Sequence, residues 1–392
     1  MDKTMRILVV FIFELFMNVS IQGSSLVSMP GTRVKDSSLQ TLDLIGQKMC
    51  VYQCSYHSDC KAVNFNKRQL TCDLLTRSGQ EDPGYLQHDA DYVHIYNIPN
   101  DQISDFCKNK SCPAYHRCVS GKTKASCIIS ECSTQSISIR NGFITKTRLQ
   151  IGDFLNFTCA NGYSKRNVIF RCLSSGNIEN AEKLVCYKKE GPWTIAFKIQ
   201  SNSGAHPLNA FNDTGTQQER NVSFPAVCVS LNKETGCDVP YRTGLIDDWE
   251  QLNVQNVLFS VTISSTSKQE IIFNGRDSTN IDWFSGTRVI NSSWTDVTST
   301  QTYLYFGILG WQDTNVNRFW SIMRIHNGCP GDTGWFISSH SPSTGCSFDL
   351  PSQTSIPYPV FRACPAPTAC LMESETVEAE AFSVLIWAEN LI

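Results

Sequence analysis

The chain has 392 residues, which is too long for one ordinary hydrophobic core and indicates several domains. It carries 33 Lys and Arg residues against 36 Asp and Glu residues, so its near-neutral charge excludes a basic field for nucleic acid. It also excludes an acidic tail that would adsorb strongly to mineral. Of the 18 cysteines, twelve lie between residues 50 and 186 in three groups of four. This pattern predicts a disulfide framework formed in an oxidising compartment.

Residues 1–23 have the features of a secretory signal peptide. Lys3 and Arg6 precede an apolar run from Ile7 to Met17, and small and polar residues follow up to a cleavage site near Gly23. The alternative is an uncleaved membrane anchor, for which the apolar run is short because a span needs about 20 residues. We therefore expect a secreted, extracellular protein with no membrane span.

Five sequons lie beyond this segment, and each places an asparagine where a glycosyltransferase acts if the site is exposed. The candidate glycosylation sites are Asn109, Asn156, Asn212, Asn221 and Asn291.

The first module spans residues 24–99. Cys50 and Cys54 are four residues apart, which places them on one face of a helix, and residues 62–65 and 71–75 have the pattern of short strands. A helix stapled twice to a sheet is the structure that this pattern predicts.

The runs Cys60-Lys-Ala-Val-Asn-Phe65 and Cys72-Asp-Leu-Leu75 resemble the PAN/apple family. The resemblance implies the pairs Cys50–Cys72 and Cys54–Cys60. It also implies a module that binds proteins or carbohydrates through loops that vary between members. The motif residues themselves are structural, so they do not name a ligand.

The second module spans residues 100–130, and its four cysteines have the spacing of the first half of an EGF-like repeat. The family pattern continues with Cys-x-Cys, whereas here the next cysteine, Cys132, fits the following module better. The resemblance implies a truncated EGF-like segment with the pairs Cys107–Cys118 and Cys112–Cys127. We favour a stapled spacer over a calcium site, because the acidic cluster that such repeats use is incomplete.

The third module spans residues 131–187 and contains an Asn141-Gly142 turn signal between short β runs. The order of its cysteines, aromatic residues and turns resembles a sushi domain, which implies the pairs Cys132–Cys172 and Cys159–Cys186. The Trp that this family carries after the third cysteine is replaced by Ile178. We therefore expect a divergent sushi domain whose core is repacked around Ile178 and Tyr163.

The C-terminal domain spans residues 188–392 and contains all eight tryptophans. Apolar residues alternate with period two over residues 193–199, 257–263, 303–309 and 319–325, and turn-forming pairs separate these runs. The prediction is a large all-β, sandwich-like domain, so that the whole chain is multidomain and mainly β.

The tryptophans of this domain divide into two groups by their surroundings. Those within alternating runs are expected in the core, namely Trp193, Trp320 and Trp387. Those near turns are candidate carbohydrate contacts, because an exposed indole stacks on a sugar ring; they are Trp283, Trp294 and Trp311. Burial in the β core is the alternative for this second group.

Six cysteines of the domain allow fifteen pairings. Proximity in the sequence favours Cys228–Cys237 and Cys364–Cys370, which leaves Cys329–Cys346.

Several runs of the domain resemble a domain of uncharacterised secreted proteins of corals and other marine invertebrates. They include Trp193-Thr-Ile-Ala-Phe197 and Gly328-Cys-Pro-Gly-Asp-Thr-Gly-Trp335. Some of those proteins are skeletal organic matrix proteins of stony corals, and the order of modules is similar. The resemblance implies a setting in a calcified skeleton and no known activity.

The motifs of common enzymes are missing: we find no nucleophile elbow, zinc-binding helix, phosphate loop or dinucleotide fingerprint. We therefore expect no enzymatic activity, no cofactor and no metal site. Asp247, Asp248 and Asp313 are weak calcium candidates that a solvated turn explains better.

The favoured function is a secreted matrix glycoprotein that scaffolds extracellular proteins and glycans, including components associated with calcium carbonate. The alternative is a soluble carbohydrate-binding recognition or adhesion protein.

Overall fold

The computed structural model describes residues 26–35, 38–55, 57, 59–80, 83–98, 107, 111–120, 124–231, 237–313, 316–340, 346–351 and 357–391. The expected signal peptide and the sequon at Asn109 lie outside the described residues. The described chain is mainly β, as the sequence predicts, and forms two compact units. Unit 1 comprises residues 1–137, 145–156 and 169–181; unit 2 comprises residues 138–144, 157–168 and 182–392.

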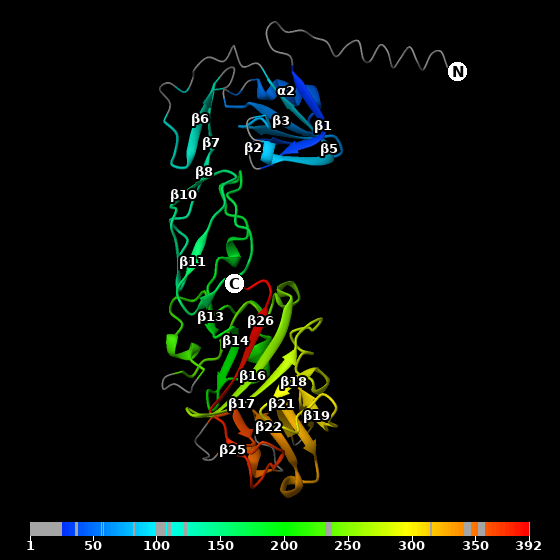
Figure 1. Cartoon of the computed structure of the whole chain (residues 1–392). Helices are drawn as coiled ribbons and strands as arrows, with labels where there is room; N and C mark the ends of the chain where they lie inside the picture. The colour runs from blue at the N-terminus through cyan, green and yellow to red at the C-terminus, as the bar shows by residue number, and fades with distance from the viewer. Residues whose placement is uncertain are drawn as a thin grey trace, which may run out of the picture. The chain divides into compact units, whose positions relative to one another are not determined.

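Unit 1 begins with a five-stranded antiparallel sheet of order β1-β5-β3-β4-β2 (Figure 1). Its strands are β1 (Val27–Val34), β2 (Ser38–Leu42), β3 (Ala62–Asn66), β4 (Thr71–Leu75) and β5 (Leu86–Tyr96). Helix α2 (Gln47–Cys54) lies against β3 and β4 and buries Cys50 and Cys54. Disulfides join Cys50 to Cys72 and Cys54 to Cys60, so two covalent links hold the helix to the sheet.

A polar network crosses the core of this sheet. His94 is 0% exposed and Asn64 is 2% exposed. The Gly79 N–H donates to His94 Nε2 at 3.3 Å, so the His94 Nδ1–H donates to Asn64 Oδ1 at 3.0 Å. Asn64 also bonds the Val34 backbone N–H and carbonyl. Burial lowers the pKa of His94 to about 4, which keeps the ring neutral near pH 7.

The rest of unit 1 consists of two small strand pairs. β6 (His116–Ser120) pairs with β7 (Ala125–Ile129), and β8 (Glu131–Ser133) pairs with β10 (Arg148–Gln150). Ile178 is buried and its backbone bridges that of Cys172, so it fills a core position as expected.

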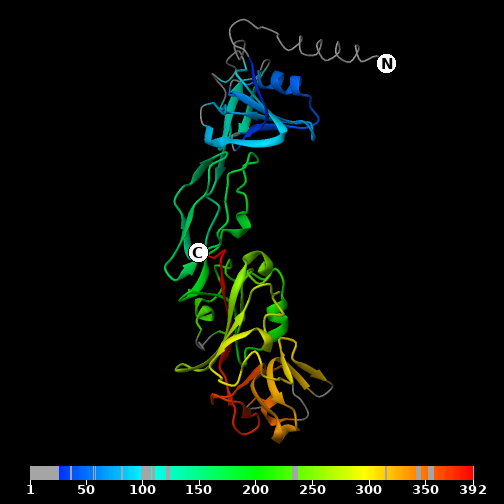
Figure 2. The ribbon, with the colours of Figure 1, turned by 45° about the vertical axis from the view of Figure 1, so that its right-hand side comes forward.

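Unit 2 contains an eight-stranded sheet of order β12-β13-β14-β26-β16-β17-β18, with β15 beside β14. Its last strand in the sequence, β26, lies between β14 and β16 and runs the length of the sheet, in red (Figure 2). The strands are β12 (Tyr163–Ser164), β13 (Tyr187–Glu190), β14 (Trp193–Gln200), β15 (Tyr241–Arg242), β16 (Val254–Ser264), β17 (Ser267–Asn274), β18 (Val289–Ser292) and β26 (Ala381–Ala388). β9 (Gly142–Ile144) pairs separately with β11 (Phe157–Cys159), and the short helix α3 (Pro207–Asn212) follows β14.

A second, seven-stranded sheet completes unit 2, with order β19-β21-β22-β23-β25 and with β20 and β24 at its sides. Its strands are β19 (Tyr305–Gly307), β20 (Trp311–Asp313), β21 (Val316–Ile325), β22 (Thr333–Ser339), β23 (Val360–Ala363), β24 (Cys370–Leu371) and β25 (Val377–Glu378).

The two sheets of unit 2 share one aromatic core. Trp320 of β21 is fully buried, and its ring stacks 6.3 Å from that of Phe197 and 6.0 Å from that of Phe259. Phe382 of β26 lies 5.0 Å from the same indole. Since these partners come from the eight-stranded sheet, the indole joins the two layers, as in a β-sandwich.

The sheet continues across the predicted boundary between residues 187 and 188, which falls inside β13. β13 pairs with β12 on one side and with β14 on the other. Arg166 forms an ion pair with Asp248, and the Ser164 and Thr194 hydroxyls lie 3.0 Å apart. Residues 157–168 of the third module therefore belong to the same compact unit as the C-terminal domain.

Candidate binding sites

Two of the three candidate carbohydrate tryptophans are buried, so their assignment as sugar contacts is wrong. Trp283 is 0% exposed, and its indole N–H donates to the Asn280 carbonyl at 3.0 Å. Trp294 is also 0% exposed and donates to the Cys364 carbonyl at 2.9 Å. Both follow turns, but these turns fold back over the aromatic core, which the local sequence does not reveal.

Trp311, the third candidate, is partly exposed. Its ring stacks on Tyr305 at 5.0 Å and meets the edge of His326 at 4.4 Å. Behind it, the buried guanidinium of Arg318 lies 5.9 Å from the ring centre. With neighbours on two sides, Trp311 offers less free ring surface than its position near a turn suggests.

The Arg318 guanidinium is the centre of a buried charge cluster. It donates to Asp349 Oδ2 at 2.8 Å and to Asp332 Oδ2 at 3.4 Å, and all three side chains are about 1% exposed or less. His326 lies 2.9 Å from Asp332 and is partly exposed. Because both carboxylates already pair with Arg318, this cluster stabilises the second sheet.

The tryptophans expected in the core also divide. Trp320 is fully buried, but Trp387 is 47% exposed and Trp193 is partly exposed, so the prediction for Trp387 is wrong. Strand β26 places Val384 and Ile386 on the inner face, in the core. Trp387 follows Ile386 and therefore points to the outer face.

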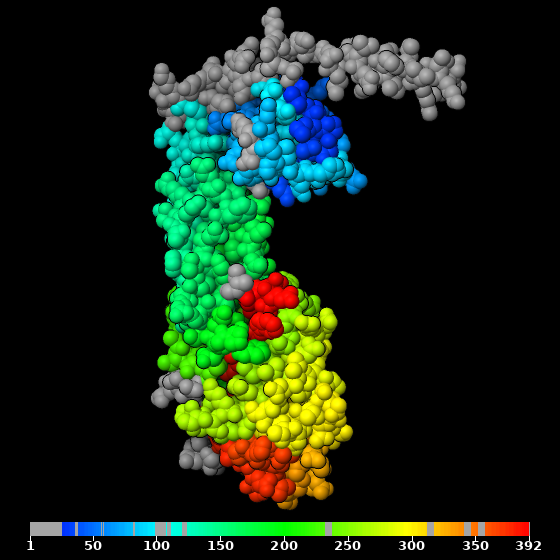
Figure 3. Space-filling view, in the orientation of Figure 1, coloured from blue at the N-terminus to red at the C-terminus, as the bar shows by residue number. Residues whose placement is uncertain are grey.

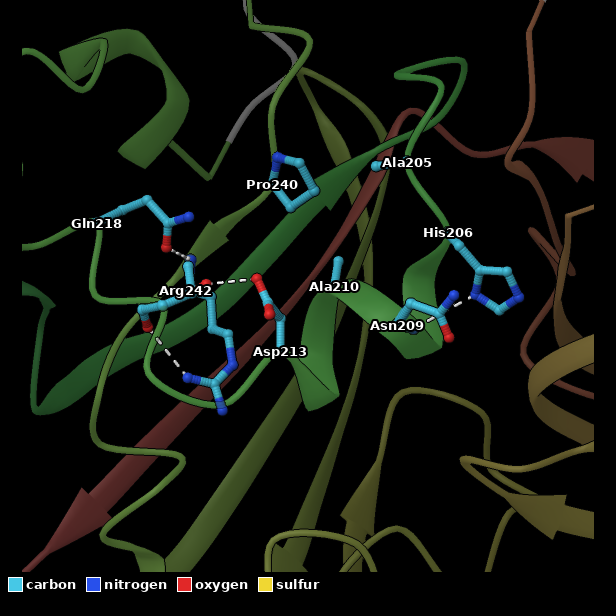
Figure 4. A pocket seen from close by; sticks show the side chains of 9 residues that line it. Ala205, His206, Asn209, Ala210, Asp213, Gln218, Pro240 and Arg242 are labelled. Atoms are coloured by element: carbon cyan, nitrogen blue, oxygen red, sulfur yellow. Dashed lines mark hydrogen bonds between the residues drawn. The ribbon is translucent and has the colours of Figure 1, made fainter.

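A cavity of about 440 Å³ lies beside α3 and β15 in unit 2 (Figure 4). The residues that line it are Ala205, His206, Asn209, Ala210, Asp213, Thr216, Gln218, Pro240 and Arg242. The Arg242 side chain is 1% exposed and already donates to both Asp247 oxygens, to the Phe211 carbonyl at 2.7 Å and to the Thr216 carbonyl at 3.1 Å. Its charge is therefore largely engaged within the protein.

The histidine of this cavity is neutral near pH 7. Burial and the neighbouring His340 lower the pKa of His206 to about 4. His206 Nδ1 accepts a hydrogen bond from the Asn209 N–H at 3.4 Å, and Figure 4 shows its ring turned away from Arg242 and Asp213. What remains is a polar hollow suited to a small neutral group, with no paired nucleophile and base among its described lining residues.

One buried carboxyl lies next to the cavity. Glu219 is 4% exposed and accepts from the Gly244 N–H at 2.9 Å through Oε1. Burial raises the pKa of Glu219 to about 7, against the smaller opposing effects of that hydrogen bond and of Arg242.

The aspartates proposed as calcium ligands are engaged elsewhere. Asp247 pairs with Arg242, and Asp248 pairs with Arg166. Among the described residues, no group of three or more His, Cys, Asp or Glu side chains is placed to hold a metal ion. The side chain of Asp313 lies outside the described part of the structure.

The structure joins the eighteen cysteines in nine disulfides, and they are the nine pairs named above. The six bonds of the small modules are Cys50–Cys72, Cys54–Cys60, Cys107–Cys118, Cys112–Cys127, Cys132–Cys172 and Cys159–Cys186. The three of the C-terminal domain are Cys228–Cys237, Cys329–Cys346 and Cys364–Cys370.

The four described sequons all have exposed asparagines, which glycosylation requires. They are Asn156, Asn212, Asn221 and Asn291. Their occupancy stays a prediction.

The first module presents four large apolar side chains to solvent, which the sequence analysis did not single out. Leu44 is 88% exposed, and the neighbouring Ile45 N–H donates to the Leu70 carbonyl at 2.9 Å, which places the two loops together. Met49 and Tyr52, three residues apart on α2, are about half exposed. We call Leu44, Met49, Tyr52 and Leu70 the apolar surface of the first module.

The five-stranded sheet, its stapled helix and its polar core can now be compared with known families. Residues 25–98 match the family model of the PAN domain. The match covers the whole sheet with α2 and both staples, and it agrees with the boundaries 24–99 predicted from the cysteine pattern.

The PAN domain is a protein- or carbohydrate-binding module of extracellular proteins, and a disulfide-rich chain is typical of that setting. A search of curated proteins gave no match to the chain. No helix among the described residues is long and apolar enough to cross a membrane.

Proposed function

We propose that the chain is a secreted modular binding protein that scaffolds extracellular proteins and glycans without catalysing a reaction. The observation that carries the proposal is the PAN domain at residues 25–98, embedded in a chain with nine disulfides. Disulfides of this density stabilise small modules in an oxidising compartment, where such a domain meets its ligands.

The apolar surface of the PAN domain supports a protein partner. Four large apolar side chains that stay in solvent lower the free energy of the complex when a partner covers them. Leu44 and Leu70 lie on loops rather than on strands, and loops are where ligand contacts concentrate on a rigid scaffold.

The non-catalytic part of the proposal is supported by the cavity of unit 2. Its arginine is engaged by Asp247 and its histidine is neutral near pH 7. Neither group is free to act as an electrophile or a strong acid on a bound substrate.

We place this protein in the organic matrix of a calcified skeleton, with the EGF-like and sushi-like modules as stapled spacers. The module order and the tryptophan-containing motifs of residues 188–392 support this setting, together with the near-neutral charge, which suits a scaffold better than a mineral nucleator. The second candidate is a soluble recognition or adhesion protein that binds carbohydrate, and the PAN domain favours it equally.

A binding measurement on the secreted full-length chain tests the proposal. The chain and its Leu44→Ser/Leu70→Ser variant are passed over immobilised proteins extracted from decalcified skeleton. We expect at least a tenfold loss of retention for the variant, because its apolar surface no longer gains from burial. Leu309→Ser is the control, since Leu309 is 55% exposed in unit 2. Equal retention of all three proteins would contradict a role of this surface.

A further inference from the structure

The outer face of the eight-stranded sheet carries a row of side chains that the function proposed above does not use. Antiparallel partners project to the same face of a sheet, so the strand register defines which side chains are neighbours. Thr194 pairs with Ile386, which sets Trp193 opposite Trp387. Trp387 pairs with Asn256, and Asn256 pairs with Asn274.

Glu190 extends the row at its other end, because it pairs with Trp193 across the β13–β14 hairpin. We call Glu190, Trp193, Trp387, Asn256 and Asn274 the tryptophan row. It crosses five adjacent strands, and at about 4.8 Å between strands it is about 19 Å long.

A covered row lies directly beside it. Ile195, Leu385 and Leu258 occupy the next outward-facing positions and are buried under Phe224 and Tyr241. The covering segment therefore ends beside the tryptophan row and leaves that row open.

The exposure of the row agrees with this arrangement. Trp387 is 47% exposed, Glu190 and Asn274 are exposed, and Trp193 and Asn256 are partly exposed. Figure 3 shows atoms of the C-terminal segment, in red, at the molecular surface.

The polar groups of the row are not consumed by the protein itself. Within the described part of the chain, the indole N–H groups of Trp193 and Trp387, the Asn256 amide and the Glu190 carboxylate have no hydrogen-bond partner. Asn274 Oδ1 accepts from the Arg276 N–H, and its amide N–H groups remain free.

We propose that the tryptophan row binds a chain of neutral pyranose sugars laid across the strands. The faces of indole rings carry partial negative charge and attract the C–H faces of sugar rings, which are weakly positive. The free amides and the carboxylate flank the indoles on both sides, where they donate to and accept from sugar hydroxyls. Two aromatic rings flanked by unpaired polar groups match the alternation of apolar faces and hydroxyl rims along a glycan.

The composition of the row favours a glycan over a second protein. A stable protein interface buries about 800 Å² on each partner around a desolvated apolar core. A single row with a carboxylate at one end and an amide at the other is smaller and more polar than that. The strip also lies apart in sequence from the PAN domain, so its failure would leave the proposed function of that domain standing.

Retention on polysaccharides tests the proposal. The secreted full-length protein is applied to chitin, cellulose and mannan and to an array of neutral oligosaccharides, beside Trp387→Ala, Asn256→Ala and Leu309→Ala. We expect wild-type retention on at least one of these probes, a loss of affinity of at least tenfold for Trp387→Ala, and a smaller loss for Asn256→Ala. Leu309→Ala removes an equally exposed apolar side chain of the same unit and should bind like the wild type.

Two further measurements separate the other occupants. Trp387→Tyr keeps an aromatic ring on the strand and should recover part of the affinity, which shows that the loss is not caused by misfolding. The series is repeated with Asn291→Gln, because Asn291 lies on the same face, opposite Ile272, and a glycan attached there would compete for the row. No retention of the wild type in either series, or equal retention of Trp387→Ala, would overturn the proposal, as would a shift of Trp387→Ala alone from dimer to monomer on size exclusion.

Discussion

At residue 310 the second sheet of unit 2 leaves room for no side chain beyond hydrogen. Gly310 has a φ of +56°, and a Cβ built there would lie 2.0 Å from the Arg318 carbonyl oxygen. Gly191 has a similar φ of +58°, but nothing lies within 4 Å of its Cβ position. The two glycines thus share a left-handed backbone and differ in the space around it.

We predict that Gly310→Ala destabilises the C-terminal domain far more than Gly191→Ala does. Both variants lose about 1–2 kcal/mol through the left-handed conformation, and Gly310→Ala adds a clash with backbone that cannot rotate away. Denaturant unfolding followed by tryptophan fluorescence reports this domain alone, because all eight tryptophans lie within it. Equal midpoints for the two variants would show that the β20–β21 turn relaxes easily.

The tryptophans show what a sequence pattern leaves undetermined at this scale. Alternation alone put Trp387 in the core because its strand is apolar on both faces, from Ala381 to Ile386. The face of each position depends on which rows the segment with Phe224 and Tyr241 covers, and that is a tertiary fact. Trp283 and Trp294 failed in the opposite direction, since their turns fold over the core.

At the scale of elements, the PAN sheet contains a titratable ring that has to stay neutral. The folded pKa of His94 is about 4, below the value of about 6.5 in an unfolded chain. The folded state therefore binds fewer protons between these values. Its stability is complete above pH 6.5 and falls as the pH drops toward 4.

We predict a loss of protection in β3 and β5 between pH 6.5 and pH 4, because protonation of His94 places a charge in the apolar core. Hydrogen exchange of peptides from these strands, corrected for the intrinsic rate at each pH, measures it. His94→Gln removes the titrating ring and should flatten the profile. An unchanged profile in that variant would assign the pH dependence to other groups, such as His57, whose pKa is also lowered by burial.

Several elements were predictable because one covalent or periodic constraint defines each of them. The spacing of Cys50 and Cys54 indicated α2, and alternating runs indicated β14, β16 and β21. The extension of the large sheet through β12 and β13 was not predictable, because two-residue pairings leave no periodic signal. The open tryptophan row has the same origin, since it exists only in the register of five strands.

At the scale of the whole molecule, the chain carries a PAN domain near one end and the tryptophan row near the other. If both bind, one chain links two partners, and the second contact gains from the local concentration that the first creates. A scaffold needs this property, and the stapled modules between the two provide it without a large core of their own.

We predict that mild reduction unfolds residues 24–186 before the C-terminal domain. The small modules depend on six disulfides, whereas the C-terminal domain also has the aromatic core around Trp320. Limited proteolysis under increasing reductant should leave a fragment that begins between residues 187 and 193. Persistence of the small modules after loss of that fragment would contradict the prediction.

The most direct test of the central claim is quantitative mass spectrometry of washed, decalcified skeleton from the source organism, with soft tissue as the comparison. The account predicts that peptides from the PAN domain and from residues 188–392 are enriched together in the occluded skeletal fraction. Peptides confined to tissue or mucus would contradict the skeletal scaffold and leave the soluble recognition protein as the better account.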